Sequence, residues 1–162
     1  LNKKTMEKRV SLMLKNRGDK YVIFYMVDLD NFKNVNDTLG HIYGDQAIVE
    51  TAQCLNKVFA NQDCIGRLGG DEFAVCVSYQ AFDEQGLLEF IGKKAQEICA
   101  GNRRTYTDNA ASVSITSSIG VAYAPDMGDS FTELYTQADC ALYYSKANGK
   151  DQYHIYSPKD DN

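Results

Sequence analysis

The stretch that decides the fold reads Arg67-Leu68-Gly69-Gly70-Asp71-Glu72-Phe73. It predicts a β-hairpin, because residues 64–68 and 73–77 have strand composition and Gly69 and Gly70 can both supply the positive φ angles of a tight turn. The turn would hold the neighbouring carboxylates of Asp71 and Glu72 at a fixed point. An arbitrary pair of acids at a hairpin tip is more often a solvated turn than a site, so its meaning depends on the rest of the chain.

A second acidic segment follows an apolar run. Residues 21–27 are rich in β-branched and aromatic types, which predicts a central strand buried on both faces, and Asp28-Leu29-Asp30 comes directly after it. Unpaired acids are costly to bury, so this segment either caps the next helix through Asp30 or forms a metal site. If the hairpin pairs beside this strand, Asp28 and Asp71 converge at one edge. Hard oxygen ligands there suit Mg²⁺ and two-metal phosphoryl transfer.

The rest of the chain predicts an α+β fold. Apolar residues at helical spacing indicate helices from the start of the chain to Gly18, over 31–39 and 41–59, from Asp83 to near Gly101, and from the capping box at Ser130 to Gly149. Residues 112–124 favour a long strand or hairpin arm, residues 152–156 a short strand, and residues 102–110 a loop. This order predicts a mixed sheet of about five or more strands with flanking helices, built on a ferredoxin-like core.

Composition bounds the classes of protein to consider. The 162 residues suit one domain over 1–162, and the first residue is not Met, which suggests a domain excised from a longer chain. No apolar run approaches the roughly 20 residues of a membrane span, and no signal peptide opens the chain, so we expect a cytoplasmic location. A net charge of −5 argues against a nucleic-acid partner. The five cysteines are odd in number and lack C-x-x-C spacing, which predicts buried free thiols.

Several spaced motifs together resemble the GGDEF family of diguanylate cyclases. They are residues 28–37, Gly40-His41, Gly44-Asp45 and residues 67–73, with Ser118-Ile119-Gly120 and residues 138–146 fitting as well. The resemblance spans nearly the whole chain. It implies a fold of the nucleotidyl cyclase or polymerase palm type. It also implies that two copies of the domain, paired by a two-fold axis, condense two GTP into cyclic di-GMP and two pyrophosphates.

The resemblance implies a metal site and a proton acceptor. The side chains of Asp28 and Asp71 and the backbone carbonyl of Leu29 would hold Mg²⁺, with Mn²⁺ as the alternative. Asp71 is also the implied proton acceptor, and Glu72 lies beside it with a role in metal or hydroxyl contact. The metal would acidify the attacking hydroxyl and neutralise developing charge.

The resemblance also implies the residues that bind GTP. Phe32 and Lys33 match the loop that cradles the phosphates, where Lys33 could stabilise transition-state charge; a core Phe and a solvated Lys are the plainer interpretations. The remaining matches are Asn36 and Asp45 for guanine, His41 for the lining of the guanine pocket, and Lys146 and Lys150, from the last helix, for the γ- and β-phosphates.

The chain departs from the family at its inhibitory product site. Many relatives carry R-x-x-D before the hairpin, and the matching residues here are Ala60-Asn61-Gln62-Asp63. Asp63 is retained, but Ala60 lacks the guanidinium that would hold the product, so we expect this site to be degenerate.

Two alternatives stay open. One is a catalytically silent GGDEF domain that binds GTP or cyclic di-GMP and regulates a partner, although retention of the acids argues against it. The other is a different nucleotidyl cyclase or a polymerase palm, from which Asp45 would distinguish this chain by favouring guanine. An upstream sensory or regulatory domain is an expected partner, and the full-length protein could be anchored to a membrane.

Overall fold

The computed structural model describes residues 1–60 and 64–161. In chain order it contains α1 (Lys3–Lys15), β1 (Tyr21–Asp30), α2 (Phe32–Leu39), α3 (His41–Val58), β2 (Cys64–Gly69), β3 (Glu72–Tyr79), α4 (Glu84–Gly101), β4 (Arg104–Thr107), β5 (Ser112–Ala124), α5 (Phe131–Ala147), β6 (Gln152–Ile155) and the 3₁₀ turn η1 (Pro158–Asp161). In this part of the chain, no helix is both long and apolar enough to cross a bilayer.

The strands form one mixed sheet around β1. Its order is β2-β3-β1-β5-β4, with β6 pairing parallel to β5 and the other pairs antiparallel. The side chains from Val22 to Val27 have no exposed surface, as predicted for a central strand buried on both faces. This sheet with its flanking helices confirms the predicted α+β class and the pairing of the hairpin beside β1.

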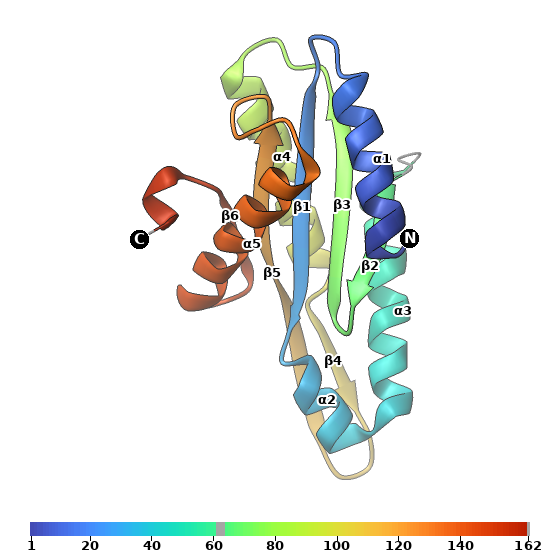
Figure 1. Cartoon of the computed structure of the whole chain (residues 1–162). Coiled ribbons are helices and arrows are strands. Elements are labelled where there is room, and N and C mark those ends of the chain that lie inside the picture. Colours follow the sequence, from blue (N-terminus) through green and yellow to red (C-terminus); the bar gives the residue numbers. More distant parts are fainter. Residues whose placement is uncertain (61–63, 162) are drawn as a thin grey trace.

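The alternation of side chains along β1 divides the core into two layers. Phe24 and Met26 pack in one cluster with residues of α1 and α5, whereas Tyr25 and Val27 pack in the other with residues of α3 and α4. Each buried side chain of this size stabilises the fold by roughly 1.5–3 kcal/mol relative to an exposed one. The sheet therefore lies between two helical layers. In Figure 1 the lower end of β1 leads into α2, and the tip of the β2–β3 hairpin points toward the same end.

Register brings the two acidic segments together at that end. β1 continues through Asp30, so Asp28 lies within the strand, directly opposite Glu72 on β3 and Ser118 on β5. The hairpin turn, which includes Asp71, comes directly before Glu72 in the chain. The acids of the two segments are therefore neighbours in space although 43 positions separate Asp28 from Asp71 in the sequence.

Two local predictions were wrong, and one of the two interpretations of Asp30 is excluded. Only Gly70 of the glycine pair has a positive φ, of 38°, while Gly69 ends β2 at a register shift. Residues 104–107 form a strand, β4, instead of part of a loop. Asp30 does not cap α2, because the N-cap residue is Asn31 and no side chain caps that helix end.

The thiols largely follow the prediction. All five cysteines are free. Three of them are buried, and the other two, Cys54 and Cys140, are partly exposed.

Close packing of α5 on β5 generates the first testable prediction. A Cβ atom at Gly120 would lie 2.0 Å from the carbonyl oxygen of Ala138 and 2.3 Å from the backbone nitrogen of Leu142. Because both are backbone atoms, relief requires α5 to move away from the sheet. Gly120→Ala is therefore expected to lower the free energy of unfolding by about 1–3 kcal/mol or more. Urea denaturation measures this change.

Gly69→Ala is the matched control. A Cβ at Gly69 would meet nothing within 4 Å, so we expect a change within about 0.5 kcal/mol. Equal unfolding midpoints for the two variants would contradict the close packing of α5 on β5.

Candidate active site

Asp28 is an incompletely satisfied carboxylate at the end of the sheet. One of its oxygens, Oδ2, forms an ion pair with Nζ of Lys146 on α5. The other, Oδ1, is buried and has no hydrogen-bond partner among the described residues. The Asp28 side chain is only 14% exposed, so solvent does not replace the missing partner well. An oxygen in this condition can still accept a hydrogen bond or bind a cation.

The charges around Asp28 explain its ionisation. Burial and the neighbouring Asp71 together raise the pKa of Asp28 to about 6, although Lys146 opposes the shift. Burial lowers the pKa of Lys146, but the hydrogen bond and charge of Asp28 outweigh it and raise the pKa overall. The charges of Asp30 and Asp71 also raise the pKa of Lys146, so negative charge exceeds positive charge at this point.

The hairpin tip is tied to β1 at Asp71. The carbonyl oxygen of Asp71 accepts a hydrogen bond of 3.2 Å from the amide of Leu29, and Arg67 closes the turn by donating through Nε to the carbonyl of Gly70 at 2.8 Å. These contacts fix Asp71 relative to Asp28. The Leu29 side chain is buried in the α3–α4 core cluster, so only its backbone serves this edge.

Glu72 has different surroundings from Asp71. It lies on the α1–α5 side of the sheet, where burial raises its pKa, followed by the charges of Asp139 and Asp71, while Lys3 and Tyr135 oppose the rise. The two adjacent acids therefore do not share one environment.

A hollow of about 420 Å³ opens beside these acids. It collects five of the residues that sequence predicted, namely Leu29, Phe32, Lys33, Asp71 and Lys146, and adds Asn31, Asn34 and Asp37. The three added residues lie three positions apart, and this polar repeat along α2 could have indicated them.

The start of α2 faces this hollow without a cap. Asn31 adopts the left-handed conformation with φ of 71°, which turns the chain sharply from β1 into α2, and its side chain donates to the carbonyl of Ser114 at 3.1 Å instead of capping the helix. Uncapped N–H groups and the helix dipole favour an anion at such an end. Phe32 packs partly against the core and Lys33 is exposed, as their plainer interpretations predicted. Both residues also line the hollow.

A second group lies where α2 meets α3. Asn36 is packed so closely on Gly44 that a Cβ there would lie 1.8 Å from its Oδ1. Asp45 follows on α3 and is exposed, as is His41 in the first turn of that helix. Asn36 and Asp45 are thereby brought together across the α2–α3 junction, outside the lining residues of the hollow.

Lys146 and Lys150 occupy different elements. Lys146 is in the last turn of α5, but Lys150 lies beyond the end of that helix, in the loop before β6, with φ of 62°. The prediction that both come from the last helix is therefore wrong for Lys150. Of the inhibitory tetrad, Ala60 is exposed just after α3, and Asp63 lies outside the described residues.

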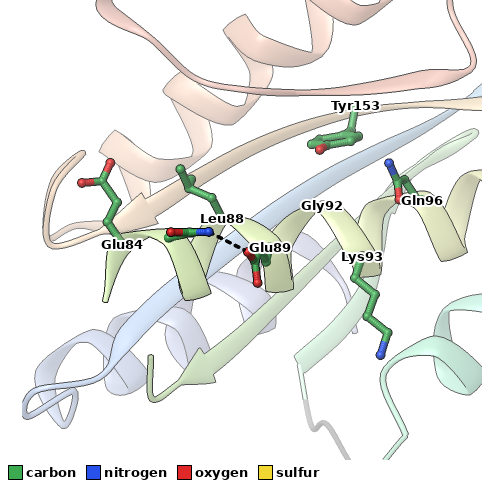
Figure 2. Close-up of a pocket in the computed structure, with 8 residues that line it drawn as sticks. Glu84, Leu88, Glu89, Gly92, Lys93, Gln96 and Tyr153 are labelled. Carbon is green, nitrogen blue, oxygen red and sulfur yellow. Dashed lines mark hydrogen bonds between the residues drawn. The ribbon is translucent and has the colours of Figure 1, made fainter. Parts of the chain in front are cut away.

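A larger hollow, of about 700 Å³, lies away from these acids along α4 and β6. Figure 2 shows its lining: Glu84, Leu88, Glu89, Gly92, Lys93, Gln96 and Tyr153 are labelled, and Gln85 donates to Glu89 at 3.1 Å. None of the predicted site residues lines it. Its charged groups lie mostly on the solvated side of one helix, without the buried, unpaired oxygen that marks Asp28.

Comparison with known proteins agrees with the resemblance. A family model described as "Diguanylate cyclase, GGDEF domain" matches residues 1–152. A bifunctional diguanylate cyclase/cyclic di-GMP phosphodiesterase, MucR of Pseudomonas aeruginosa, is 34% identical over 86% of this chain and 20% of its own length. The cyclic di-GMP phosphodiesterase PdeR of Escherichia coli is 29% identical over 98% of this chain and 23% of its own length. The chain thus spans about a fifth of these two relatives.

A solved structure shares the fold. The GGDEF domain of YfiN, also called TpbB, from Pseudomonas aeruginosa superposes with a TM-score of 0.88 at 28% identity, covering 99% of this chain and 92% of that one. The family model covers nearly all the described elements, from α1 to the start of β6. The chain therefore belongs to the GGDEF-domain family, and its candidate site lies at the β1 end and hairpin that give the family its motifs.

Proposed function

We propose that this domain is a diguanylate cyclase that condenses two GTP into cyclic di-GMP and two pyrophosphates. The observation that carries the proposal is the buried, unpartnered Oδ1 of Asp28 at the edge where Asp71 also lies. A domain that had lost its chemistry would gain stability by replacing this carboxylate, because burying an unsatisfied charge is costly. Its retention supports a bound cation.

The donor set fits Mg²⁺ or Mn²⁺. Asp28 and Asp71 would hold the ion by their side chains and Leu29 by its carbonyl oxygen, which are the hard oxygen ligands that these cations prefer. When bound, the ion would acidify the attacking 3′-hydroxyl and neutralise charge on the phosphates.

The residues of the hollow would bind the triphosphate. The uncapped first turn of α2 offers backbone N–H donors next to Phe32, and Lys33 supplies a positive charge at the same end. Lys146 would exchange its Asp28 partner for the γ-phosphate once a cation balances Asp28. Lys150 would contact the β-phosphate from the loop that follows α5.

The α2–α3 junction would read the base. A carboxylate at Asp45 can accept from both N1–H and the 2-amino group of guanine, which adenine cannot offer in that arrangement, and the Asn36 amide can add a contact at the same edge. His41 would line this pocket from the first turn of α3.

Transfer would take place between two copies of the domain. Asp71 would accept the proton of the 3′-hydroxyl of its GTP while that oxygen forms a bond to the α-phosphorus of the other GTP and the bond to pyrophosphate breaks. Glu72 would contact the metal or the hydroxyl group from the neighbouring strand. Two such steps, one in each direction, close the cyclic product.

A silent regulatory domain is the second candidate. It is favoured by one observation, that the relative PdeR is named as a phosphodiesterase. Such a domain would bind GTP with Mg²⁺ but form no cyclic di-GMP, so product formation distinguishes the two functions.

We also propose the cellular context of the activity. The domain would act in the cytoplasm, where GTP is available, as one catalytic unit under an upstream sensory domain. Because Ala60 offers no guanidinium, product inhibition through the site shared with Asp63 would be weak or missing.

Replacing Asp71 tests the reaction. Asp71→Asn removes the proton acceptor and a metal ligand but little packing, so cyclic di-GMP formation from GTP and Mg²⁺ should fall by about 10²-fold or more. Chromatography of the products measures it. Asp19→Asn, which neutralises an exposed acid before β1, is the control and should leave turnover unchanged. Undiminished turnover in Asp71→Asn would rule out the role of Asp71 in the reaction. If the wild type binds GTP but forms no cyclic di-GMP, the silent domain is favoured.

Gly44 tests the guanine pocket without harming the fold. A Cβ at this position displaces only the end of the Asn36 side chain, and Ala in a helix interior is roughly 0.5–1 kcal/mol more favourable than Gly. We therefore expect Gly44→Ala to unfold at an equal or higher temperature than the wild type. Its preference for GTP over ATP should nevertheless fall about tenfold. Competition binding gives the preference, with Asp45→Ala as the reference for its loss. An unchanged preference in both variants would exclude this pocket.

The raised pKa of Asp28 predicts a pH dependence of the metal-free domain. Its folded pKa of about 6 lies above the value of about 4 for an unfolded aspartate, so stability falls as the pH rises through this window. Asp28→Asn should therefore stabilise the metal-free domain above about pH 7, with the advantage shrinking near pH 4.5. Thermal unfolding in EDTA at both pH values tests this. An advantage that grows on acidification would contradict the assigned burial.

A further inference from the structure

The loop between α5 and β6 is held in an unfavourable conformation. Lys150 and Asp151 are consecutive residues with φ of 62° and 49°. Non-glycine residues are disfavoured in this left-handed region, so two in succession persist only where other contacts hold them.

Hydrogen bonds fix the backbone on both sides of Lys150. Its amide donates to the carbonyl of Ser145 at 3.0 Å, and its carbonyl accepts from Nε2 of Gln152 at 3.0 Å. The next amide, that of Asp151, donates to Oδ2 of Asp30 at 3.2 Å. Only the Lys150 side chain, which is exposed, is left free to move.

Asp30 anchors this loop to the sheet. It is 4% exposed and also accepts from Oγ1 of Thr116 at 2.6 Å and Oγ of Ser118 at 2.7 Å, both on β5. Both of its oxygens are thus occupied by donors of the protein. Asp30 is therefore a fixed point of the sheet, one residue before Asn31 in the lining of the hollow.

Arg103 holds the loop through the Asp151 side chain. Its Nε donates to both carboxylate oxygens of Asp151, at 3.1 and 2.9 Å, and it precedes β4. The Arg103 side chain is 53% exposed, so it contributes little to the core. Asp151 is consequently hydrogen-bonded through its amide to Asp30 and through its carboxylate to Arg103.

We propose that Asp30, Asp151 and Arg103 form a clamp that positions Lys150 for the outer phosphates of the nucleotide. The inference rests on the proposed function and names the residues that act on Lys150 without touching the nucleotide. A lysine on a fixed backbone loses only side-chain freedom on binding an anion, whereas a lysine on a loose loop would also lose backbone freedom. An ordinary turn would be enough to connect α5 to β6. The clamp therefore explains why this loop contains two residues in the left-handed conformation.

A double-mutant cycle tests the clamp. The ligands are a non-hydrolysable GTP analogue and GMP, which lacks the outer phosphates, each with Mg²⁺. Arg103→Ala should weaken binding of the GTP analogue about three- to tenfold and leave GMP binding unchanged. It should have no further effect in a Lys150→Ala background, and Arg103→Lys should restore part of the loss. Arg17→Ala, which removes an arginine bonded to the carbonyl of Lys20, is the matched control.

Hydrogen exchange gives a readout that needs no ligand. The Asp151 amide should exchange faster in Arg103→Ala than in the wild type, because Asp151 has lost one of the two side chains that hold it. Unchanged exchange, additive losses in the cycle, or equal losses for GMP would each overturn the clamp. If the wild type makes cyclic di-GMP but Arg103→Ala has no effect, only the clamp fails; if the wild type binds no GTP, the proposed function fails with it.

Discussion

The structure depends on two aspartates at the end of β1 that differ in how fully their carboxylates are hydrogen-bonded. Asp28 and Asp30 are two positions apart on one strand and therefore point to the same side of the sheet. Asp30 receives donors on both oxygens from Thr116, Ser118 and the amide of Asp151, whereas Asp28 has one ion pair and one oxygen without a described partner. The first carboxylate is a structural element, and the second is available to a ligand.

The rest of the fold makes this difference possible. A strand at the centre of the sheet can present Asp28 in a buried place, because the apolar residues before it pack into both core layers and offset its cost. The hairpin brings Asp71 alongside through the amide of Leu29, and α5 brings Lys146. Three elements distant in sequence thus converge on one carboxylate, while α2 adds an uncapped helix end beside it.

Sequence predicted the elements whose patterns are local and strong. Three local patterns are each typical of one kind of element: the apolar run of β1, the glycine pair of the hairpin and the capping box of α5. β4 was missed because Arg104-Thr105-Tyr106-Thr107 buries only Tyr106 and pairs with β5 alone, so it has no strand-like apolar pattern. The role of Asp30 was missed because its donors lie 86 to 121 positions away. The candidate site residues were predicted through motif resemblance, and long-range packing brings several of them together in one hollow.

The most direct test of the account is a crystal structure of the domain with Mn²⁺ and a non-hydrolysable GTP analogue. Anomalous scattering locates Mn²⁺ independently of the protein atoms. The account predicts a peak within coordination distance of Oδ1 of Asp28, with Asp71 and the Leu29 carbonyl as further ligands and Lys146 turned from Asp28 toward a phosphate. At saturating Mn²⁺, an Asp28 still paired only with Lys146 and no anomalous peak beside it would contradict the account.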